Sequence, residues 1–532
     1  MPNLPKTEHE LAKYFDHTYL KPDATDKEMK KLCDEARALD TAMVAINTAW
    51  TIPCKEWLKG TDVHVGAAIS FPLGQSGLES KLFECEQAIK DGCDEIDYVI
   101  HIGKAKMHDW DYIKEEMEKM TAICHRYDIP CKVIFENCYL TKDEIRRLSE
   151  IAKEVKPDYI KTSTGFGTGG ATVEDVALMK SVVGDDVKVK AAGGIRDWPT
   201  CKAMIEAGAS RIGTSSSIKI LEQFREEQEK PYILEPIPDY TIWGNDILSK
   251  FRHADKNYGT WWEVSAHPYC TNPIKGSDMT LQELIDSDPD QMLGQGLGHH
   301  EMLRVAFLDA KDALSIQVHP YDTYAAEHEN DFGKDESWYV IDAVPGAKLV
   351  AGTKTSDPDT LKEAVKNGTL EQHLIYHDVK PGDYIDIPAG TLHALGAGIF
   401  AIEVGTNSNT TYRFYDYNRK DANGNTRPLH LEKSFDVADF ARKPHVVEAK
   451  EETRVLSDMP SYTVTEVYAK EDVTYPQNGT YCLISNIGDD TSVETGEKEY
   501  ELKKFESCFI PASASCVTIK KGAHVLYSKV KG

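Results

Sequence analysis

Short apolar runs alternate with amphipathic segments along the first part of the chain. Apolar residues three and four positions apart predict helices over 27–38, 78–89, 112–124, 140–155 and 172–183. The apolar runs between these segments are typical of buried strands. They lie at 42–46, 63–71, 95–102, 131–135, 158–162, 187–191 and 211–213, with one more near 15–20.

This alternation predicts a parallel sheet whose strands are joined by helices. Seven strands, plus the one near 15–20, fit an α/β TIM-type (β/α)8 barrel over residues 1–225. A doubly wound open sheet is the alternative, but no GxGxxG follows the first strand to favour it.

The pattern changes after residue 225. Residues 226–241 are rich in charge and proline, which is typical of an extended linker. Beyond it, short apolar runs at 314–318, 337–341 and 384–387 predict strands, and helical patterns are confined to short stretches such as 280–285 and 358–365. We therefore expect an all-β core in the second half.

Composition limits the partners of the chain. The formal net charge of −26 over 532 residues argues against nucleic acid or an anionic membrane as the main partner, because both need a basic face. Small phosphorylated molecules remain compatible, since they need only a local anion site. Twelve cysteines without a CxxC pair, no signal-like N-terminus and no apolar run of ~20 residues predict a cytoplasmic protein.

Lys161 is the first candidate for chemistry. It ends an apolar strand-like run and is followed by hydroxyls and glycines. A buried lysine is unfavourable unless it is paired or deprotonated, and a deprotonated lysine is a nucleophile toward carbonyls. Asp97 and Lys190 lie on other predicted strands, so two lysines would meet at one barrel mouth and depress each other's pKa. For any one of the three, a solvated strand end or a structural ion pair is the alternative.

An anion site is the second candidate. Gly193 and Gly194 follow the Lys190 strand, and Gly213, Ser215 and Ser216 end the next one. In TIM barrels the loops after the last two strands often hold phosphate through backbone N–H groups. Glycine pairs alone are more often simply turns.

The first 225 residues closely resemble deoxyribose-phosphate aldolase. The motifs that carry the resemblance are Asp16-His-Thr-Tyr-Leu-Lys-Pro-Asp-Ala-Thr25, Phe71-Pro-Leu-Gly74, Asp94-Glu-Ile-Asp97, the run from Lys161 to Asp175, Lys190-Ala-Ala-Gly-Gly-Ile-Arg196 and Arg211-Ile-Gly-Thr-Ser-Ser216. The resemblance implies an imine on Lys161, tuned by Lys190, with Asp97 in proton transfer. It further implies phosphate bound by Gly193, Gly194, Gly213, Ser215 and Ser216, no cofactor, and reversible cleavage of 2-deoxyribose 5-phosphate to glyceraldehyde 3-phosphate and acetaldehyde.

A metal site is indicated in the second half. The period of two places Gln317 and His319 on one face of a strand, as two ligands of one metal should be. Glu336 and His393 supply an oxygen and a second imidazole, and this donor set suits Zn²⁺ with a position left open. A single strand histidine is more often a core residue. The Gly, Pro, Gly and His of the run 382–393, however, have the cupin spacing.

A faint repeat of that run lies at 505–516. Phe505, Ser513 and Cys516 stand where Gly382, Gly390 and His393 stand in the first copy, and Pro511 keeps the proline. Partners for Cys516 as a ligand are missing. We therefore predict a zinc cupin over 242–445 and a smaller, metal-free cupin over 446–532, together a double cupin (jelly-roll) half.

The chain from about residue 240 to its end resembles a class I mannose-6-phosphate isomerase of the short bacterial kind. The resemblance rests on Trp262-Glu-Val-Ser-Ala-His-Pro268, Gln317-Val-His-Pro320, Gly333-Lys-Asp-Glu-Ser-Trp-Tyr339, Gly390-Thr-Leu-His-Ala-Leu-Gly396, the run 407–417 and Leu429-His-Leu-Glu-Lys433. It implies zinc on Gln317, His319, Glu336 and His393, substrate contacts from Lys334 and Arg413, and interconversion of mannose 6-phosphate and fructose 6-phosphate. An ion pair between Arg413 and Asp416 is the alternative role of that arginine.

The second half also departs from that family. Relatives usually carry glutamines where Gly405 and Thr406 stand, an aspartate at Asn409, and Glu-Ala where Thr260-Trp261 stand. We read the chain as a fusion of two sugar-phosphate enzymes. Two alternatives for the second half stay open, a sugar-phosphate-binding regulatory module and an isomerase of another aldose. A homo-oligomer is compatible with both folds.

Overall fold

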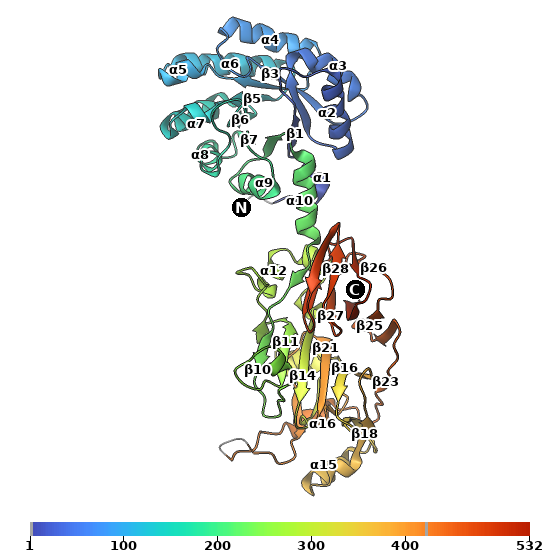
Figure 1. The fold of residues 1–532 in the computed structure, drawn as a ribbon. Coiled ribbons are helices and arrows are strands. Elements are labelled where there is room, and N and C mark those ends of the chain that lie inside the picture. Colours follow the sequence, from blue (N-terminus) through green and yellow to red (C-terminus); the bar gives the residue numbers. More distant parts are fainter. Residues whose placement is uncertain (1–3, 421–423, 532) are drawn as a thin grey trace. The chain divides into compact units, whose positions relative to one another are not determined.

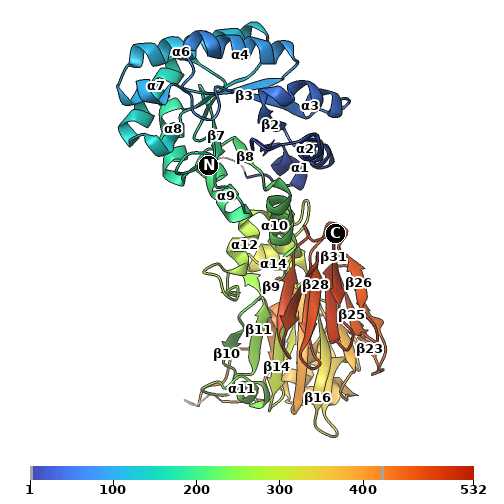
Figure 2. The same ribbon diagram turned by 45° about the horizontal axis from the view of Figure 1, so that its top comes forward.

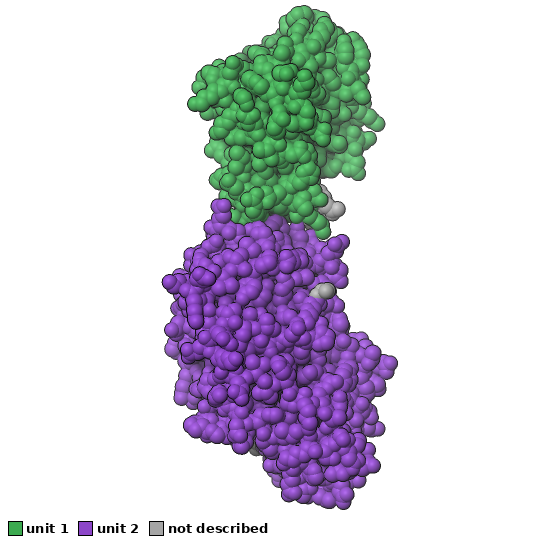
Figure 3. Space-filling model, turned by 90° about the vertical axis from the view of Figure 1, so that its right-hand side faces the viewer, with its two compact units in different colours: residues 1–227 green, residues 228–532 purple. Residues whose placement is uncertain are grey.

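The computed structural model describes residues 4–420 and 424–531, which divide into two compact units. We call residues 1–227 the barrel unit and residues 228–532 the β unit, as coloured in Figure 3. Within the described residues, no helix has the length and apolar character needed to cross a membrane.

The barrel unit is a closed parallel barrel of eight strands (Figure 1). β1 pairs with both β2 and β8, so the sheet has no free edge. This confirms the predicted TIM barrel and excludes the open sheet. The strands are β1 (Phe15–Thr18), β2 (Met43–Asn47), β3 (His64–Ile69), β4 (Glu95–Val99), β5 (Cys131–Ile134), β6 (Tyr159–Lys161), β7 (Lys188–Ala192) and β8 (Arg211–Thr214).

Helices surround this barrel, and side-chain caps fix where several of them begin. Thr25 and Thr141 form capping boxes with the glutamates three residues further on, which satisfies backbone N–H groups that the helix leaves open. The longer helices are α2 (Asp26–Leu39), α3 (Thr51–Trp57), α4 (Leu78–Lys90), α6 (Trp110–Arg126), α7 (Lys142–Val155), α8 (Val173–Val183), α9 (Trp198–Glu206) and α10 (Ser217–Glu229). The short ones are α1 (Glu8–Ala12), η1 (Thr48–Trp50), α5 (Ile102–Lys106) and η2 (Asn137–Tyr139).

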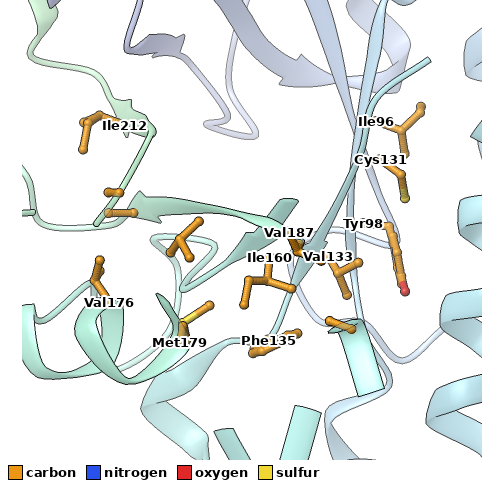
Figure 4. Packing of buried hydrophobic residues seen from close by; sticks show 14 of the residues in the cluster. Ile96, Tyr98, Cys131, Val133, Phe135, Ile160, Val176, Met179, Val187 and Ile212 are labelled. Atoms are coloured by element: carbon orange, nitrogen blue, oxygen red, sulfur yellow. The ribbon is translucent and has the colours of Figure 1, made fainter. Parts of the chain in front are cut away.

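The main core of the barrel unit lies between strands and helices. Figure 4 shows part of it, with Ile96 and Tyr98 from β4, Cys131 and Val133 from β5, and Ile160 from β6. Because successive strand residues point to opposite faces, the residues between these apolar ones point into the barrel. The same alternation that builds the core therefore sends Asp97 and Lys161 to the interior.

The first part of the β unit, residues 237–447, is built from two antiparallel sheets and short helices (Figure 1). One sheet has the order β10 (Ile237–Asp239), β11 (Thr260–Val264), β14 (Leu303–Ala310), β21 (Ile399–Thr406), β16 (Glu336–Ala343), β19 (Tyr384–Ile387), β23 (His445–Val447). The other has β18 (Leu374–Asp378), β17 (Lys348–Thr353), β20 (His393–Ala394), β15 (Ile316–Val318), β22 (Tyr412–Tyr415), and a hairpin joins β12 (Ala266–His267) to β13 (Cys270–Thr271). The helices are α11 (Ile247–Phe251), α12 (Leu281–Ser287), α13 (Pro289–Met292), η3 (His299–Glu301), α14 (Asp322–His328), α15 (Pro358–Lys366), η4 (Leu370–His373) and α16 (Leu431–Val437).

A second pair of antiparallel sheets completes the β unit (Figure 2). The larger has the order β24 (Arg454–Asp458), β25 (Tyr462–Tyr468), β32 (His524–Val530), β27 (Cys482–Asn486), β30 (Ser507–Ile510), β9 (Tyr232–Ile233). The smaller has β26 (Val473–Pro476), β31 (Cys516–Ile519), β28 (Thr491–Thr495), β29 (Lys498–Leu502). This architecture confirms the predicted all-β, cupin-like second half. One apolar cluster includes Phe307 and Phe400 as well as Tyr462 and Phe509, so both pairs of sheets share a core.

The structure differs from the extended linker expected at 226–241. Helix α10 continues to Glu229, β9 pairs with β30, and β10 pairs with β11. The apolar residues between the prolines explain the difference, because Tyr232, Ile233 and Ile237 have sheets to lie against. Proline lacks an N–H, so such strands are restricted to sheet edges, which is where β9 and β10 lie.

Candidate active sites in the two units

Three predicted residues of the barrel unit meet in its interior. Lys161 Nζ lies 2.8 Å from Asp97 Oδ2, and Lys190 Nζ lies 2.6 Å from the same oxygen. The lysines come from the neighbouring strands β6 and β7, where they are register partners. All three side chains are at most 3% exposed. The structure thus brings two ammonium groups onto one carboxylate in a water-poor site.

Burial and neighbouring charges shift the pKa values of Lys161 and Asp97. Burial is the largest influence on Lys161, and together with the like charge of Lys190 it lowers the pKa of Lys161 to about 8 against the attraction of Asp97. Burial works against the charged form of Asp97 too, but Lys132, Lys161 and Lys190 hold the pKa of Asp97 well below its usual value. Lys161 can therefore be an amine near neutral pH beside a permanent carboxylate.

The sequence analysis gave no role to four other charged residues of this interior. Lys132 Nζ lies 2.7 Å from Asp97 Oδ1 and 2.5 Å from Glu95 Oε2. Asp16 binds Lys190, and Arg211 lies 2.8 Å from Asp16. The signal for Lys132 was present, because it sits between the apolar residues Cys131 and Val133 as Lys161 follows Ile160.

The glycines assigned to phosphate binding have two different settings. Gly193 and Gly194 follow β7 with φ of +86° and +83°, a backbone conformation that favours glycine. The Ala171 N–H donates to the carbonyls of Ala192 and Gly193 there, so the loops after β6 and β7 touch. Gly213 instead lies inside β8, where a Cβ atom would come 2.9 Å from Ala192 Cβ and 3.3 Å from Lys190 Cε.

The two serines lie at the start of α10. Ser215 is exposed and Ser216 is partly exposed. The Ser216 N–H donates to Thr214 Oγ1 at 3.0 Å, so this amide already has a partner.

A cavity of about 390 Å³ opens at the carboxyl ends of β3 to β6. Its walls include Leu73, Phe166, Lys106 and Glu136. The Thr164 N–H donates to Glu136 Oε1 at 3.1 Å, and burial raises the pKa of Glu136. The loop after Lys161 and the segment after β5 therefore both line this cavity. The sequence analysis did not single out Glu136.

The predicted metal ligands meet in the first part of the β unit, residues 237–447. Possible ligand atoms of His319, Glu336 and His393 lie within 4.8 Å of one another, and all three side chains are buried. In the described residues this is the only such group of three His, Cys, Asp or Glu side chains. Gln317 is the register partner of His393, and its amide lies 3.2 Å from His393 Nε2.

The hydrogen bonds of the two histidines suit a cation. His319 Nδ1 lies 3.0 Å from the Thr410 carbonyl, and His393 Nδ1 lies 2.8 Å from the Thr391 carbonyl. Each carbonyl accepts from Nδ1–H, so each Nε2 keeps its lone pair. His319 Nε2 is buried without a hydrogen-bond donor and lies 3.2 Å from Glu336 Oε2, and burial is the main reason that the pKa of His319 falls to about 4. A neutral imidazole facing a carboxylate fits a divalent metal.

Lys334 lies beside this cluster. Its Nζ is 2.6 Å from Glu336 Oε2 and 2.8 Å from Glu403 Oε1. Lys334 also lines a cavity of about 390 Å³ together with Tyr321, Asp335 and Lys531. Glu403 lies two residues before Gly405, the register partner of Glu336, so Glu403 and Glu336 face the same side of the sheet. The sequence analysis missed Glu403.

Arg413 is the register partner of Gln317 and is half-buried. Its Nη1 donates to the Pro428 carbonyl at 2.9 Å, while its Nε is buried without a partner. Among the described residues, the ion pairs of Asp416 are made by Arg419 and Arg427 rather than by Arg413. Arg413 therefore has donor capacity left on the metal side of its strand.

Three of the departures from the isomerase pattern, Gly405, Thr406 and Asn409, lie close to this cluster. Gly405 is the register partner of Glu336, and a Cβ atom there would come 3.0 Å from the Asp335 carbonyl oxygen. Thr406 Oγ1 donates to the Gly333 carbonyl at 2.9 Å, and Asn409 Oδ1 accepts from Arg304 at 3.3 Å. Of these three residues, Thr406 is thus bound to the loop before β16 and Asn409 to strand β14 by side-chain hydrogen bonds.

Comparison with known proteins assigns the two units to different relatives. Residues 10–222 match the family described as DeoC/LacD family aldolase. A deoxyribose-phosphate aldolase from Lactobacillus acidophilus is 61% identical over 216 residues, which are 41% of this chain and 91% of that protein. Another, from Bacteroides thetaiotaomicron, is 52% identical over 217 residues, again 41% of this chain and 91% of that protein.

The other part of the chain is similar to a solved mannose 6-phosphate isomerase from Bacillus subtilis. The TM-score is 0.51 at 29% sequence identity, and the match covers 56% of this chain and 99% of that one. The likeness therefore spans the whole length of a separate enzyme.

Proposed function

Residues 10–222 of this chain belong to the DeoC/LacD family of aldolases, and we propose that the barrel unit cleaves 2-deoxyribose 5-phosphate to glyceraldehyde 3-phosphate and acetaldehyde. The observation that carries this proposal is the placement of Lys161 and Lys190 on one oxygen of Asp97. Two lysines on one carboxylate leave one of them available as an amine.

The proposed chemistry begins with the Lys161 amine, which attacks C1 of the open-chain sugar. Water leaves and an imine forms. Removal of the proton from the C3 hydroxyl lets the electron pair of the C2–C3 bond move into the imine, which releases glyceraldehyde 3-phosphate and leaves an enamine. Protonation of C2 and hydrolysis then return acetaldehyde and the amine. Asp97 and Lys190 lie where they can carry these protons.

The phosphate of this substrate belongs, in our proposal, at the loops after β7 and β8. Gly193 and Gly194 present backbone at positive φ, and Ser215 and Ser216 precede the long helix α10. Backbone N–H groups at such a place favour an anion. Gly213 supports the site indirectly, since its missing side chain leaves room for Lys190.

Reduction with borohydride in the presence of acetaldehyde tests the aldolase proposal. We expect the label on Lys161, read by peptide mass spectrometry, and loss of label in Lys161→Met. Labelling of another lysine, or none, would remove Lys161 from its role.

We further propose that the β unit is a zinc-dependent isomerase that interconverts mannose 6-phosphate and fructose 6-phosphate. Gln317, His319, Glu336 and His393 would hold Zn²⁺, and the neutral imidazole of His319 facing the Glu336 carboxylate supports that assignment. Bound zinc would supply polarisation of the substrate's carbonyl and hydroxyl oxygens while a proton moves between C1 and C2. Lys334 and Arg413 would bind and orient the sugar phosphate from either side.

An isomerase of another aldose phosphate is the second candidate for the β unit. The specific observation in its favour is the set of departures at Gly405, Thr406 and Asn409, close to the metal cluster. A sugar-phosphate-binding module that regulates the aldolase is the third, and it would bind mannose 6-phosphate without turnover.

One assay separates these candidates. Conversion of mannose 6-phosphate to fructose 6-phosphate is measured with the full chain as prepared, after chelation, and after zinc is restored. Turnover that disappears and returns with zinc supports the isomerase. If the protein retains zinc but does not turn over mannose 6-phosphate, a panel of other aldose phosphates is assayed next. If mannose 6-phosphate changes the aldolase rate saturably without being converted, the regulatory module is indicated.

A further inference from the structure

The ion pairs inside the barrel join more positive than negative groups. Lys132, Lys161, Lys190 and Arg211 share three carboxylates, those of Asp16, Glu95 and Asp97. Glu136 lies nearby but makes none of these ion pairs, and burial raises its pKa. If every group is charged, one cation lacks a counter-charge in a buried site, which is unfavourable. Loss of one proton from a lysine balances the cluster, so the contacts decide which lysine loses it.

Lys132 bridges two of the carboxylates. It takes Oδ1 of Asp97 at 2.7 Å and Oε2 of Glu95 at 2.5 Å, and it is fully buried. Asp97 and Lys132 are register partners on β4 and β5, so these contacts need no unusual side-chain conformation. Burial works against the Lys132 ammonium, but Asp97, Glu95 and Asp16 raise its pKa above the ordinary value. Lys132 is the lysine that keeps its proton.

Lys161 has the weakest hold. Its ion pair is with Oδ2 of Asp97, an oxygen that it shares with Lys190, and Lys190 also binds Asp16. Occupation of Oδ1 by Lys132 further reduces the negative charge that Lys161 feels from Asp97. Lys161 is therefore the lysine that gives up its proton.

We propose that Lys132 is a positioning residue of the aldolase: by holding Asp97 and Glu95 it sets the pH at which Lys161 becomes a free amine. The inference rests on the proposed function of Lys161 as the imine-forming lysine. Lys132 acts through Asp97 and has no contact with the substrate in this scheme.

Other charged groups face Lys161 from the elements packed around it. They are Asp97 and Glu95 of β4, Lys132 of β5, Glu136 after β5, Lys190 of β7, Arg211 of β8 and Asp16 of β1. His64 of β3 contacts Glu95 at 2.8 Å from a half-exposed position. Glu95 and Lys132 carry opposite charges in one ion pair. Removal of Glu95 and removal of Lys132 should therefore shift the pKa of Lys161 in opposite directions.

The test uses two single variants and their combination. The rate at which acetaldehyde and borohydride label Lys161 is measured between about pH 6 and 10, a range that contains the titration of a perturbed lysine. Lys132→Met removes a positive charge and should raise the midpoint by roughly one pH unit. Glu95→Gln removes a negative charge and should lower it by a similar amount. The double variant restores the excess of one cation and should return the midpoint close to that of the parent chain.

Lys81→Met is the matched control. Lys81 is as buried as Lys132 and pairs with Glu116 at 2.6 Å, but it lies on α4 outside the barrel interior. It should lose stability, measured by thermal unfolding, without moving the midpoint. A purely structural role for Lys132 predicts the same behaviour for both lysines.

The outcomes separate this inference from the function on which it rests. If Lys161 of the parent chain is not labelled, the proposed aldolase role of Lys161 fails. If Lys161 is labelled and Lys132→Met leaves the midpoint in place, or both single variants move it in one direction, the role of Lys132 is overturned. Should Lys132→Met not fold, the Glu95→Gln variant decides, because a midpoint that does not fall contradicts the proposal.

Discussion

Lys161 is the residue at which burial acts most directly on chemistry. Its pKa of about 8 places the change from ammonium to amine just above neutral pH, and only the amine attacks a carbonyl. Below that pKa the fraction of amine falls tenfold for each pH unit.

A pH profile follows from this value. The kcat/KM for cleavage of 2-deoxyribose 5-phosphate should rise from pH 6, reach half of its plateau near pH 8, and level off above it. The increase has this sign because the protonated form is the inactive one. A profile that is flat from pH 6 to 9 would mean that another group limits the reaction.

The imidazole of His393 provides the corresponding prediction for the β unit. His393→Ala should reduce zinc affinity by more than the roughly 100-fold that loss of an outer-shell partner costs, because it removes a ligand atom. His445→Ala is the control. His445 is an exposed imidazole that pairs with Asp386, its register partner on β19, in the sheet that does not contain His393. Metal content after dialysis, read by mass spectrometry, distinguishes the two variants, and equal zinc in both would contradict the site.

Sequence patterns located several site residues and passed over others for physical reasons. Their positions on predicted barrel strands led us to expect Asp97, Lys161 and Lys190 at one barrel mouth, and the cupin spacing indicated His393, which lies beside Gln317. Lys132 and Glu403 also are single charges in apolar strands, but that signal does not identify the partner of the charge. Their partners come from other strands, which only the register of the sheets identifies.

At the scale of elements, β8 shows how a glycine, Gly213, can leave room for the side chain of Lys190 on the neighbouring strand. A Cβ atom on Gly213 would meet Ala192 Cβ at 2.9 Å and Lys190 Cε at 3.3 Å. Sequence analysis grouped this glycine with the phosphate loop, but its position in the strand connects it with Lys190.

Gly213→Ala tests that connection. Overpacking should cost about 1–3 kcal/mol of unfolding free energy and should displace Lys190, so we expect kcat to fall more than KM for the phosphorylated sugar rises. Gly77→Ala is the control, because a Cβ atom on Gly77 meets nothing within 4 Å. A change in KM alone would instead support the assignment of Gly213 to phosphate binding.

Helix and strand limits were easier to predict than the linker. The helices predicted over 27–38 and 140–155 agree with α2 and α7 to within a few residues, and each begins at a capping box, which is a local pattern. β9 and β10 were missed because two- and three-residue edge strands depend on the sheet that they join, and their own sequence reads as a proline-rich connector.

At the scale of the whole molecule, each unit has its own apolar core. The main cluster of the barrel unit runs from Leu11 to Phe224, and the main cluster of the β unit begins at Leu234. The ligands proposed for zinc all belong to the β unit.

Zinc removal should therefore act on one unit. A ligand that binds only the folded state stabilises the part that binds it, so chelation should lower the unfolding temperature of the β unit and leave the aldolase rate within about twofold. Calorimetry of the full chain and the cleavage assay on the same chelated sample measure both effects. A larger change in the aldolase rate would show that the two activities are coupled.

The edge strands β9 and β10 have a practical consequence for anyone who wishes to separate the two units. A truncation that starts at residue 242 would delete both strands and leave β30 and β11 with unpaired backbone groups. Exposed edges of this kind recruit other chains, so the shortened protein should aggregate. A truncation that starts near residue 228 keeps both strands and should give a well-behaved stand-alone protein.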